Sequence, residues 1–314
     1  MLFLSKQDIA VLLFHRILPV RDTMWDPIDP LLFKKTLQYV QKKYHIVPLK
    51  EVLFENKTTS SKPLAAITFD DGYHDFIDYA VPIMDKFKIT ASMYVVSDCV
   101  DKNLPPWTYL LDNLFAKTKK LFWTNFDATI LPPEYQCTKW NSSEERIAYC
   151  KKIKQYLKLM PAQQRNNIVT SALLNFDDVE NPSNLMMSWE DIKQIHSAGF
   201  EIGSHSVTHP TLATIEEEES ITFELIESAR HIKEKTNIVS DIFSYPMGNY
   251  DERVKRLTQK AGYKAALAVN GKKYTQGKQD IFEIPRIELY NESWLKTKLR
   301  SNGTVSYIKQ LKNK

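Results

Sequence analysis

Short apolar runs alternate along most of the chain with segments in which apolar residues recur every three or four positions. The runs are continuously apolar, as expected for strands buried on both faces of a parallel sheet. They predict strands at residues 9–15, 46–49, 64–71, 90–96, 200–204, 239–245, 264–269 and 284–289. The helical spacing predicts helices at residues 30–44, 76–87, 188–198, 214–235, 251–261 and from about 292. This alternation indicates parallel βαβ units and hence a barrel-like α/β fold.

The alternation stops between about residues 101 and 185, where two helical patterns follow one another at 107–120 and 143–175. We interpret this segment as a helical insertion in a single domain, 1–314, that lies at the mouth of the barrel. Its aromatic side chains either form the insertion's own core or line a sugar cleft, and the sequence leaves both readings open. They are Trp107, Tyr109, Phe115, Phe122, Trp123, Trp140 and Tyr149.

Composition narrows the class of protein. The 314 residues, 43% hydrophobic and 25% charged, suit one large globular domain with an insertion. A net charge of +4, scattered along the chain, argues against a nucleic-acid partner. Three cysteines (Cys99, Cys137 and Cys150) without metal-site spacing suit a reducing compartment. We found neither a signal-peptide pattern nor an apolar stretch of about 20 residues, so we expect a cytoplasmic protein.

Two predicted strands end in residues that can bind a cation. The strand at 64–71 ends in Asp70 and Asp71, and the one at 200–204 is followed by His205 and His209. Each feature alone has an ordinary explanation, because Asp-Asp-Gly is common in turns and two histidines four apart are a frequent coincidence. Together, two imidazoles and a carboxylate suit zinc or another first-row divalent metal, with positions left open for water.

Three stretches carry a resemblance to a known family. Residues 68–72 (TFDDG), the run from 188 to 209 that contains HSVTH, and residues 243–248 (FSYPMG) resemble the motifs of the polysaccharide deacetylases, the NodB-homology family of carbohydrate esterases. The similarity extends over about residues 9–100 and 186–290. It implies a distorted (β/α)7 barrel with the site at the carboxyl ends of the strands.

The resemblance also implies roles for the motif residues. Asp71, His205 and His209 match the family's metal ligands, and Asp70 matches its general base. The backbone N–H of Met247 matches the donor to the oxyanion. The implied cofactor is a divalent ion; we expect Zn²⁺, with Co²⁺, Ni²⁺ and Mn²⁺ as alternatives.

The chain lacks two residues of the family pattern, so other residues must take their roles. Ser244 stands where the family has an arginine that pairs with the catalytic aspartate, and Arg286 is our candidate for that cation rather than a surface ion pair. No histidine follows His231, although the family places its general acid near the C-terminus. Residues 12–15 (LLFH) resemble that missing motif, as in a permuted subgroup acting on exopolysaccharide N-acetylglucosamine. His15 is therefore our candidate acid, against the alternative of a packed core histidine.

These features predict a metal-dependent hydrolase that removes N-acetyl groups from an N-acetylhexosamine unit. Its substrate is expected to be a polysaccharide or a lipid- or nucleotide-linked precursor, which includes possible contact with a lipid-linked sugar at the membrane face. An O-acetyl (xylan-type) esterase and a non-catalytic carbohydrate-binding relative are the alternatives. Retention of both Asp70 and Asp71 counts against the non-catalytic reading, because a pure binder has no use for a base.

Overall fold

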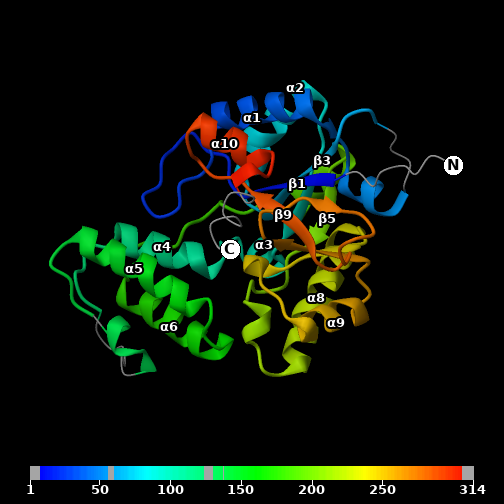
Figure 1. The fold of residues 1–314 in the computed structure, drawn as a ribbon. Helices are drawn as coiled ribbons and strands as arrows, with labels where there is room; N and C mark the ends of the chain where they lie inside the picture. The colour runs from blue at the N-terminus through cyan, green and yellow to red at the C-terminus, as the bar shows by residue number, and fades with distance from the viewer. Residues whose placement is uncertain (1–7, 56–59, 124–129, 137, 306–314) are drawn as a thin grey trace, which may run out of the picture.

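The computed structural model describes residues 8–55, 60–123, 130–136 and 138–305. Within these residues nine strands form one sheet, around which the helices are arranged (Figure 1). The strands are β1 (Asp8–Phe14), β2 (His45–Ile46), β3 (Leu64–Asp71), β4 (Ser92–Val95), β5 (Glu201–Ser204), β6 (Ile242–Ser244), β7 (Ala265–Val269), β8 (Tyr274–Thr275) and β9 (Ile284–Glu288).

Seven parallel strands close into a barrel. They follow the order β3, β4, β5, β6, β7, β9, β1, and β1 pairs in turn with β3. The first strand of the chain thus lies between the last barrel strand and β3. The short β2 runs beside β3, and β8 pairs antiparallel with β1. The expected distorted (β/α)7 barrel is confirmed.

Alternation along each strand explains why the barrel strands are apolar throughout. Every residue of β3 is buried. In β1, Ile9 and Val11 belong to a cluster with side chains from β3, β4, β6, β7 and β9, which fills the barrel. The alternate residues of β1, Ala10 and Leu12, pack against the outer helices instead. Successive strand residues point to opposite faces, so both faces of this sheet must be apolar.

Helices surround the barrel and also form a separate group beside it, α4 to α6 (Figure 1). The α-helices are α1 (Pro30–Lys43), α2 (Val81–Phe87), α3 (Ser97–Lys102), α4 (Trp107–Lys117), α5 (Ser143–Leu157), α6 (Ala162–Asn175), α7 (Trp189–Ser197), α8 (Glu218–Thr236), α9 (Glu252–Lys260) and α10 (Trp294–Ser301). Shorter π-helical or 3₁₀ turns are η1 (Glu51–Glu55), η2 (Phe76–Ala80), η4 (Pro133–Tyr135), η5 (Leu212–Thr214) and η6 (Pro246–Gly248). No helix in the described part of the chain is both long and apolar enough to cross a bilayer.

Three expected boundaries were wrong for local reasons. The helical pattern at 143–175 divides into α5 and α6 at Pro161, because a proline disfavours helix in the residue before it. The helix expected from 214 begins at Glu218, since Arg253 takes up the carbonyl oxygens of residues 215 and 216. The strand expected at 46–49 is only β2, which ends before Pro48.

The insertion has an apolar cluster of its own. Five of the seven aromatic residues singled out in the sequence fill it: Trp107, Phe115, Trp123, Trp140 and Tyr149. Tyr109 lines a cavity shared with the barrel, whereas Phe122 is 45% exposed. Cys99 and Cys150 are free and buried, and Cys137 lies outside the described residues.

Candidate active site and metal centre

The candidate residues meet at the carboxyl ends of the barrel strands. Phe14 of β1 pairs in register with Phe69 of β3, which sets His15 level with Asp70. A cavity of about 610 Å³ opens there, within the range of about 300–1,000 Å³ usual for ligand sites. Six of the predicted residues line it: His15, Asp70, Asp71, His205, His209 and Met247.

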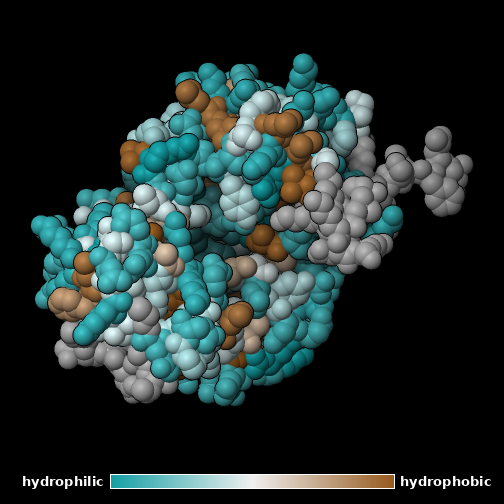
Figure 2. All heavy atoms as spheres, turned by 60° about the vertical axis from the view of Figure 1, so that its left-hand side comes forward, coloured by the Kyte–Doolittle hydropathy of each residue, from teal (hydrophilic) through white to brown (hydrophobic). Residues whose placement is uncertain are grey.

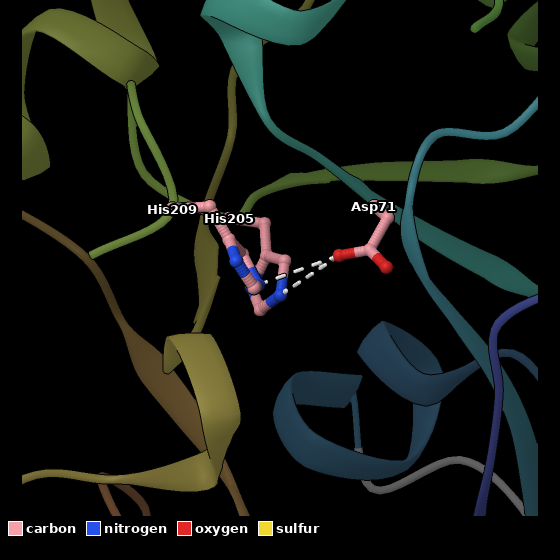
Figure 3. A group of neighbouring side chains, drawn as sticks. All are labelled: Asp71, His205 and His209. Carbon is pink, nitrogen blue, oxygen red and sulfur yellow. Dashed lines mark ion pairs between the residues drawn. The ribbon is translucent and has the colours of Figure 1, made fainter. Parts of the chain in front are cut away.

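Asp71, His205 and His209 converge on one point (Figure 3). Asp71 Oδ1 lies 3.4 Å from His209 Nε2 and 3.6 Å from His205 Nε2, and one ligand atom from each residue lies within 4.8 Å of the others. All three side chains are buried. Asp71 Oδ1 has no hydrogen-bond partner among the described residues, although burying an unpaired carboxylate oxygen is costly. An orphaned oxygen facing two imidazole nitrogens fits a divalent cation.

The ring of His205 is oriented for that role. Its Nδ1 lies 2.7 Å from the carbonyl oxygen of Ser244, to which the protonated Nδ1 donates. This leaves the lone pair on Nε2, the atom that faces Asp71. Burial and the neighbouring His205 hold the pKa of His209 well below its ordinary value, so His209 is neutral and able to ligate.

The backbone at the site adopts a conformation that side chains usually avoid. Asp71 (φ 78°), His209 (φ 59°) and Met247 (φ 59°) are all left-handed. Such residues cost about 1–3 kcal/mol each and persist only where their surroundings impose them. Next to Met247, a Cβ atom on Gly248 would lie 2.6 Å from the Val269 side chain. The turn therefore packs too closely on β7 for any residue but glycine at 248.

Two residues outside the motifs hold the histidine loop. Glu224 on α8 accepts hydrogen bonds from the backbone N–H groups of Val207 and Thr208 and from the Thr208 hydroxyl. Trp107 of the insertion donates its indole N–H to the carbonyl oxygen of His209 at 3.2 Å. Sequence analysis missed Glu224 in this role. The available signal was a glutamate on the buried face of an amphipathic helix, a position where a carboxylate needs partners.

Asp70 forms a buried ion pair with Arg286. The guanidinium donates from Nη1 to Oδ1 at 2.8 Å and from Nη2 to Oδ2 at 2.7 Å. Ser244 Oγ donates to Oδ2 as well and accepts from Arg286 Nη2. Burial alone would raise the pKa of Asp70, but the charge and hydrogen bonds of Arg286, together with the neighbouring His205 and His15, outweigh burial and hold that pKa well below its usual range. Arg286 is fully buried, so it is not part of a surface ion pair.

His15 lies on the wall of the cavity, and it is not a metal ligand in the Asp71 cluster. Its ring meets Trp25 edge-on at 5.3 Å between centroids, and its Nδ1 lies 3.7 Å from Glu288 Oε1. The side chain is 19% exposed, so it is reached from the cavity rather than sealed in the core. The structure brings His15 to the predicted place; its role as acid stays a prediction.

Comparison with known proteins agrees with the motifs. A model of the polysaccharide deacetylase family matches residues 57–266. No curated protein sequence matches the chain. Solved structures with a similar fold include the Streptococcus pyogenes deacetylase PplD in complex with acetate (17% identity, 94% of this chain and 99% of that one, TM-score 0.61). Another is IcaB from Ammonifex degensii, with 16% identity over 95% of this chain and 98% of that one and a TM-score of 0.60. A third is the BpsB deacetylase domain from Bordetella bronchiseptica, with 14% identity over 91% of this chain and 97% of that one and a TM-score of 0.57. The chain belongs to the polysaccharide deacetylase family.

Proposed function

We propose that this protein is a metal-dependent hydrolase that removes the acetyl group from an N-acetylhexosamine unit of a glycan or its precursor. The observation that carries the proposal is the side-by-side placement of an ionised, oriented Asp70 and the Asp71–His205–His209 cluster in one cavity. A cation site alone would suit a binding protein. A carboxylate kept ionised beside it is what a hydrolytic base requires.

The residues divide the work of amide hydrolysis. Asp71, His205 and His209 would hold a divalent cation, whose Lewis acidity would polarise the acetyl carbonyl and acidify water. Asp70 takes a proton from the water whose oxygen attacks the acetyl carbon. The backbone N–H of Met247 donates to the oxyanion that develops on the carbonyl oxygen, a contact worth about 3 kcal/mol. The C–N bond then breaks, and acetate and the amine leave.

His15 favours an amide over an ester. An amine departs only after its nitrogen is protonated, whereas an alkoxide from an ester depends less on an acid. His15 lies on the cavity wall in reach of solvent and can carry that proton. Fold similarity to a protein described as a de-N-acetylase from Aggregatibacter actinomycetemcomitans supports the same choice (13% identity, TM-score 0.57).

Aromatic side chains on the cavity wall suit a sugar. Trp25 and Tyr109 both line it. Arg16 fixes Tyr109 in place, because its guanidinium lies 5.1 Å from that ring and pairs with the buried Asp75 at 2.8 Å. Flat apolar faces beside charged groups are the usual lining for a pyranose ring.

The proposal is tested by acetate release. The purified protein, loaded in turn with Zn²⁺, Co²⁺, Ni²⁺ or Mn²⁺, is offered N-acetylglucosamine oligomers, single N-acetylhexosamines and O-acetylated xylan. We expect acetate from the N-acetylated sugars and little from xylan, with loss of activity in Asp70→Asn. Faster release from xylan would establish the O-acetyl esterase instead, and no release from any compound would favour the binding protein. The cytoplasmic location expected from the sequence stays a prediction.

A further inference from the structure

One wall of the cavity is built by the insertion and carries a row of lysines. Three lysines recur at intervals of three and four along α5 and at its C-cap, so they share one helix face: Lys151, Lys154 and the C-cap residue Lys158. All three line the same cavity as His15 and Asp70. Figure 2 shows the hollow between the insertion and the barrel, with a largely hydrophilic rim.

Two of these lysines already have partners. Lys151 Nζ donates to the carbonyl oxygen of Thr23 at 2.6 Å. Lys154 pairs with Asp112, a buried carboxylate that also lines the cavity. Asp112 is the only acidic side chain that the described part of the insertion places on this wall. Three ammonium groups therefore meet one carboxylate.

Lys158 is the cation without a partner. Among the described residues, no carboxylate lies within 4 Å of its Nζ, and the acidic groups that act on it from farther away are Glu288 and Asp112. Burial and the neighbouring Lys154 both lower the pKa of Lys158. A half-buried ammonium beside another cation is unfavourable in the free protein, and an anion placed between Lys154 and Lys158 would offset that cost.

Glu288 interacts with both the lysine face of the insertion and the catalytic side of the cavity. Its Oε1 lies 3.7 Å from His15 Nδ1, and it lines the same cavity as Lys158, on which its charge acts. An anion at Lys158 would thus sit on the same side as His15, outside the cluster of Asp71 with the two histidines.

We propose that the Lys154–Lys158 face of the insertion binds a phosphate group carried by the N-acetylated sugar substrate. This inference rests on the proposed deacetylase function and names its substrate class: an N-acetylhexosamine attached to a phosphate. The three ammonium groups of this wall exceed its one carboxylate by two charges, which matches the charge of about −1.5 to −2 on a phosphate better than the single charge of a carboxylate. Lysine is a common phosphate ligand, which it binds as a point charge. The phosphate could belong to a nucleotide or to a lipid carrier, since both present the same group to the lysines.

Kinetics with paired substrates test the assignment. We compare N-acetylglucosamine 1-phosphate with methyl N-acetylglucosaminide, and measure kcat/KM for each. The native protein is expected to prefer the phosphorylated sugar, and Lys158→Met to reduce this preference about tenfold, the usual effect of losing one charged hydrogen bond. Lys158→Arg should restore it. Lys152→Met is the matched control, because Lys152 lies on the same helix, does not line the cavity and donates to the carbonyl oxygen of Glu134. Added potassium chloride should raise KM for the phosphorylated sugar only.

Binding without turnover separates this inference from the proposed function. Titration calorimetry with glucosamine 1-phosphate, which has no acetyl group to lose, should show affinity that falls about tenfold in Lys158→Met. Equal affinity for methyl glucosaminide, which lacks the phosphate, or full affinity in Lys158→Met, would overturn the inference. Deacetylation of N-acetylated sugars without a phosphate would be unaffected by that result. Tighter binding of a glucuronate glycoside would assign the wall to carboxylates and also overturn it. If glucosamine 1-phosphate binds through Lys158 but no acetate is ever released, the deacetylase function fails and the phosphate site stands. Comparing uridine diphosphate and prenyl diphosphate derivatives then identifies the carrier.

Discussion

Replacing Arg286 by methionine should destabilise the fold strongly, although the new side chain is of similar length. The change removes two charged hydrogen bonds to Asp70, at 2.8 and 2.7 Å, and a third to Ser244 Oγ at 2.9 Å. The Asp70 side chain is only 3% exposed, so its charge would remain in the interior without a counter-charge from Arg286 and with only the Ser244 hydroxyl of these partners left. Breaking a buried pair in this way costs about 3–5 kcal/mol. We expect the free energy of unfolding to fall by that amount.

Urea denaturation near neutral pH measures the change, with the free energy taken from the midpoint and slope of each transition. Two further variants show whether the loss comes from the unpaired charge of Asp70. Ser244→Ala removes one hydrogen bond from Asp70 and should cost about 1 kcal/mol. The double variant Asp70→Asn/Arg286→Met leaves neither charge behind, so it should be more stable than Arg286→Met alone.

Activity gives a second readout. Without Arg286, burial is no longer outweighed and the pKa of Asp70 rises toward or above its ordinary value. Because Asp70 acts as a base only when ionised, the loss of activity on acidification should begin at higher pH in any active Arg286 variant. A loss of stability below about 1 kcal/mol in Arg286→Met would refute the reasoning. So would a double variant that is less stable than the single one.

Three further predictions concern the site and the barrel. Asp70→Asn should retain a divalent cation but lose a factor of about 10² to 10⁴ in turnover, whereas Asp71→Asn should lose the cation. Elemental analysis and rate measurements distinguish the two variants. Equal loss of the cation in both would contradict the assignment. His15→Ala should slow release of acetate from an N-acetyl sugar by about 10² or more, yet slow an aryl acetate far less, and equal effects on the two would exclude a role as acid. Gly203→Ala should lower the free energy of unfolding by about 1–3 kcal/mol, the usual cost of overpacking a core, because the added Cβ would overlap the ring of Tyr94. Urea denaturation measures this, and an unchanged free energy would show that the barrel accommodates the extra atom.

Much of the site was visible in the sequence because its key residues follow strand ends. Asp70 and Asp71 come at the end of β3, and His205 follows β5, so a local pattern was sufficient to place them at one rim. Arg286 was a candidate because an arginine on an apolar strand needs a buried partner. Placing His15 required the further step that the first strand lies beside the last in the barrel, which the pairing of β1 with β9 and β3 bears out.

What the sequence could not give are the contacts between segments far apart in the chain. Glu224 holds the loop at Val207 and Thr208 from a helix that begins beyond it, and no motif marks the residue. The hydrogen bond from Trp107 to His209 joins residues 102 positions apart. The lysine face of α5 reads from sequence as an ordinary solvated helix face. Only the packing of the insertion against the barrel turns that face toward the cavity.

The place of β1 in the barrel has a consequence for the time course of folding. Asp70 and Arg286 are 216 residues apart, and β1 can pair with β3 long before β9 exists. At synthesis rates of about 5–20 residues per second, roughly 10–40 seconds separate the appearance of the carboxylate from that of its guanidinium. During that interval the ribosome-bound chain carries an open barrel edge on β1 and an acidic group with no counter-charge. The last barrel strand, β9, both closes the sheet and brings the counter-charge to Asp70, so we expect closure of the barrel to come late in the folding of this chain.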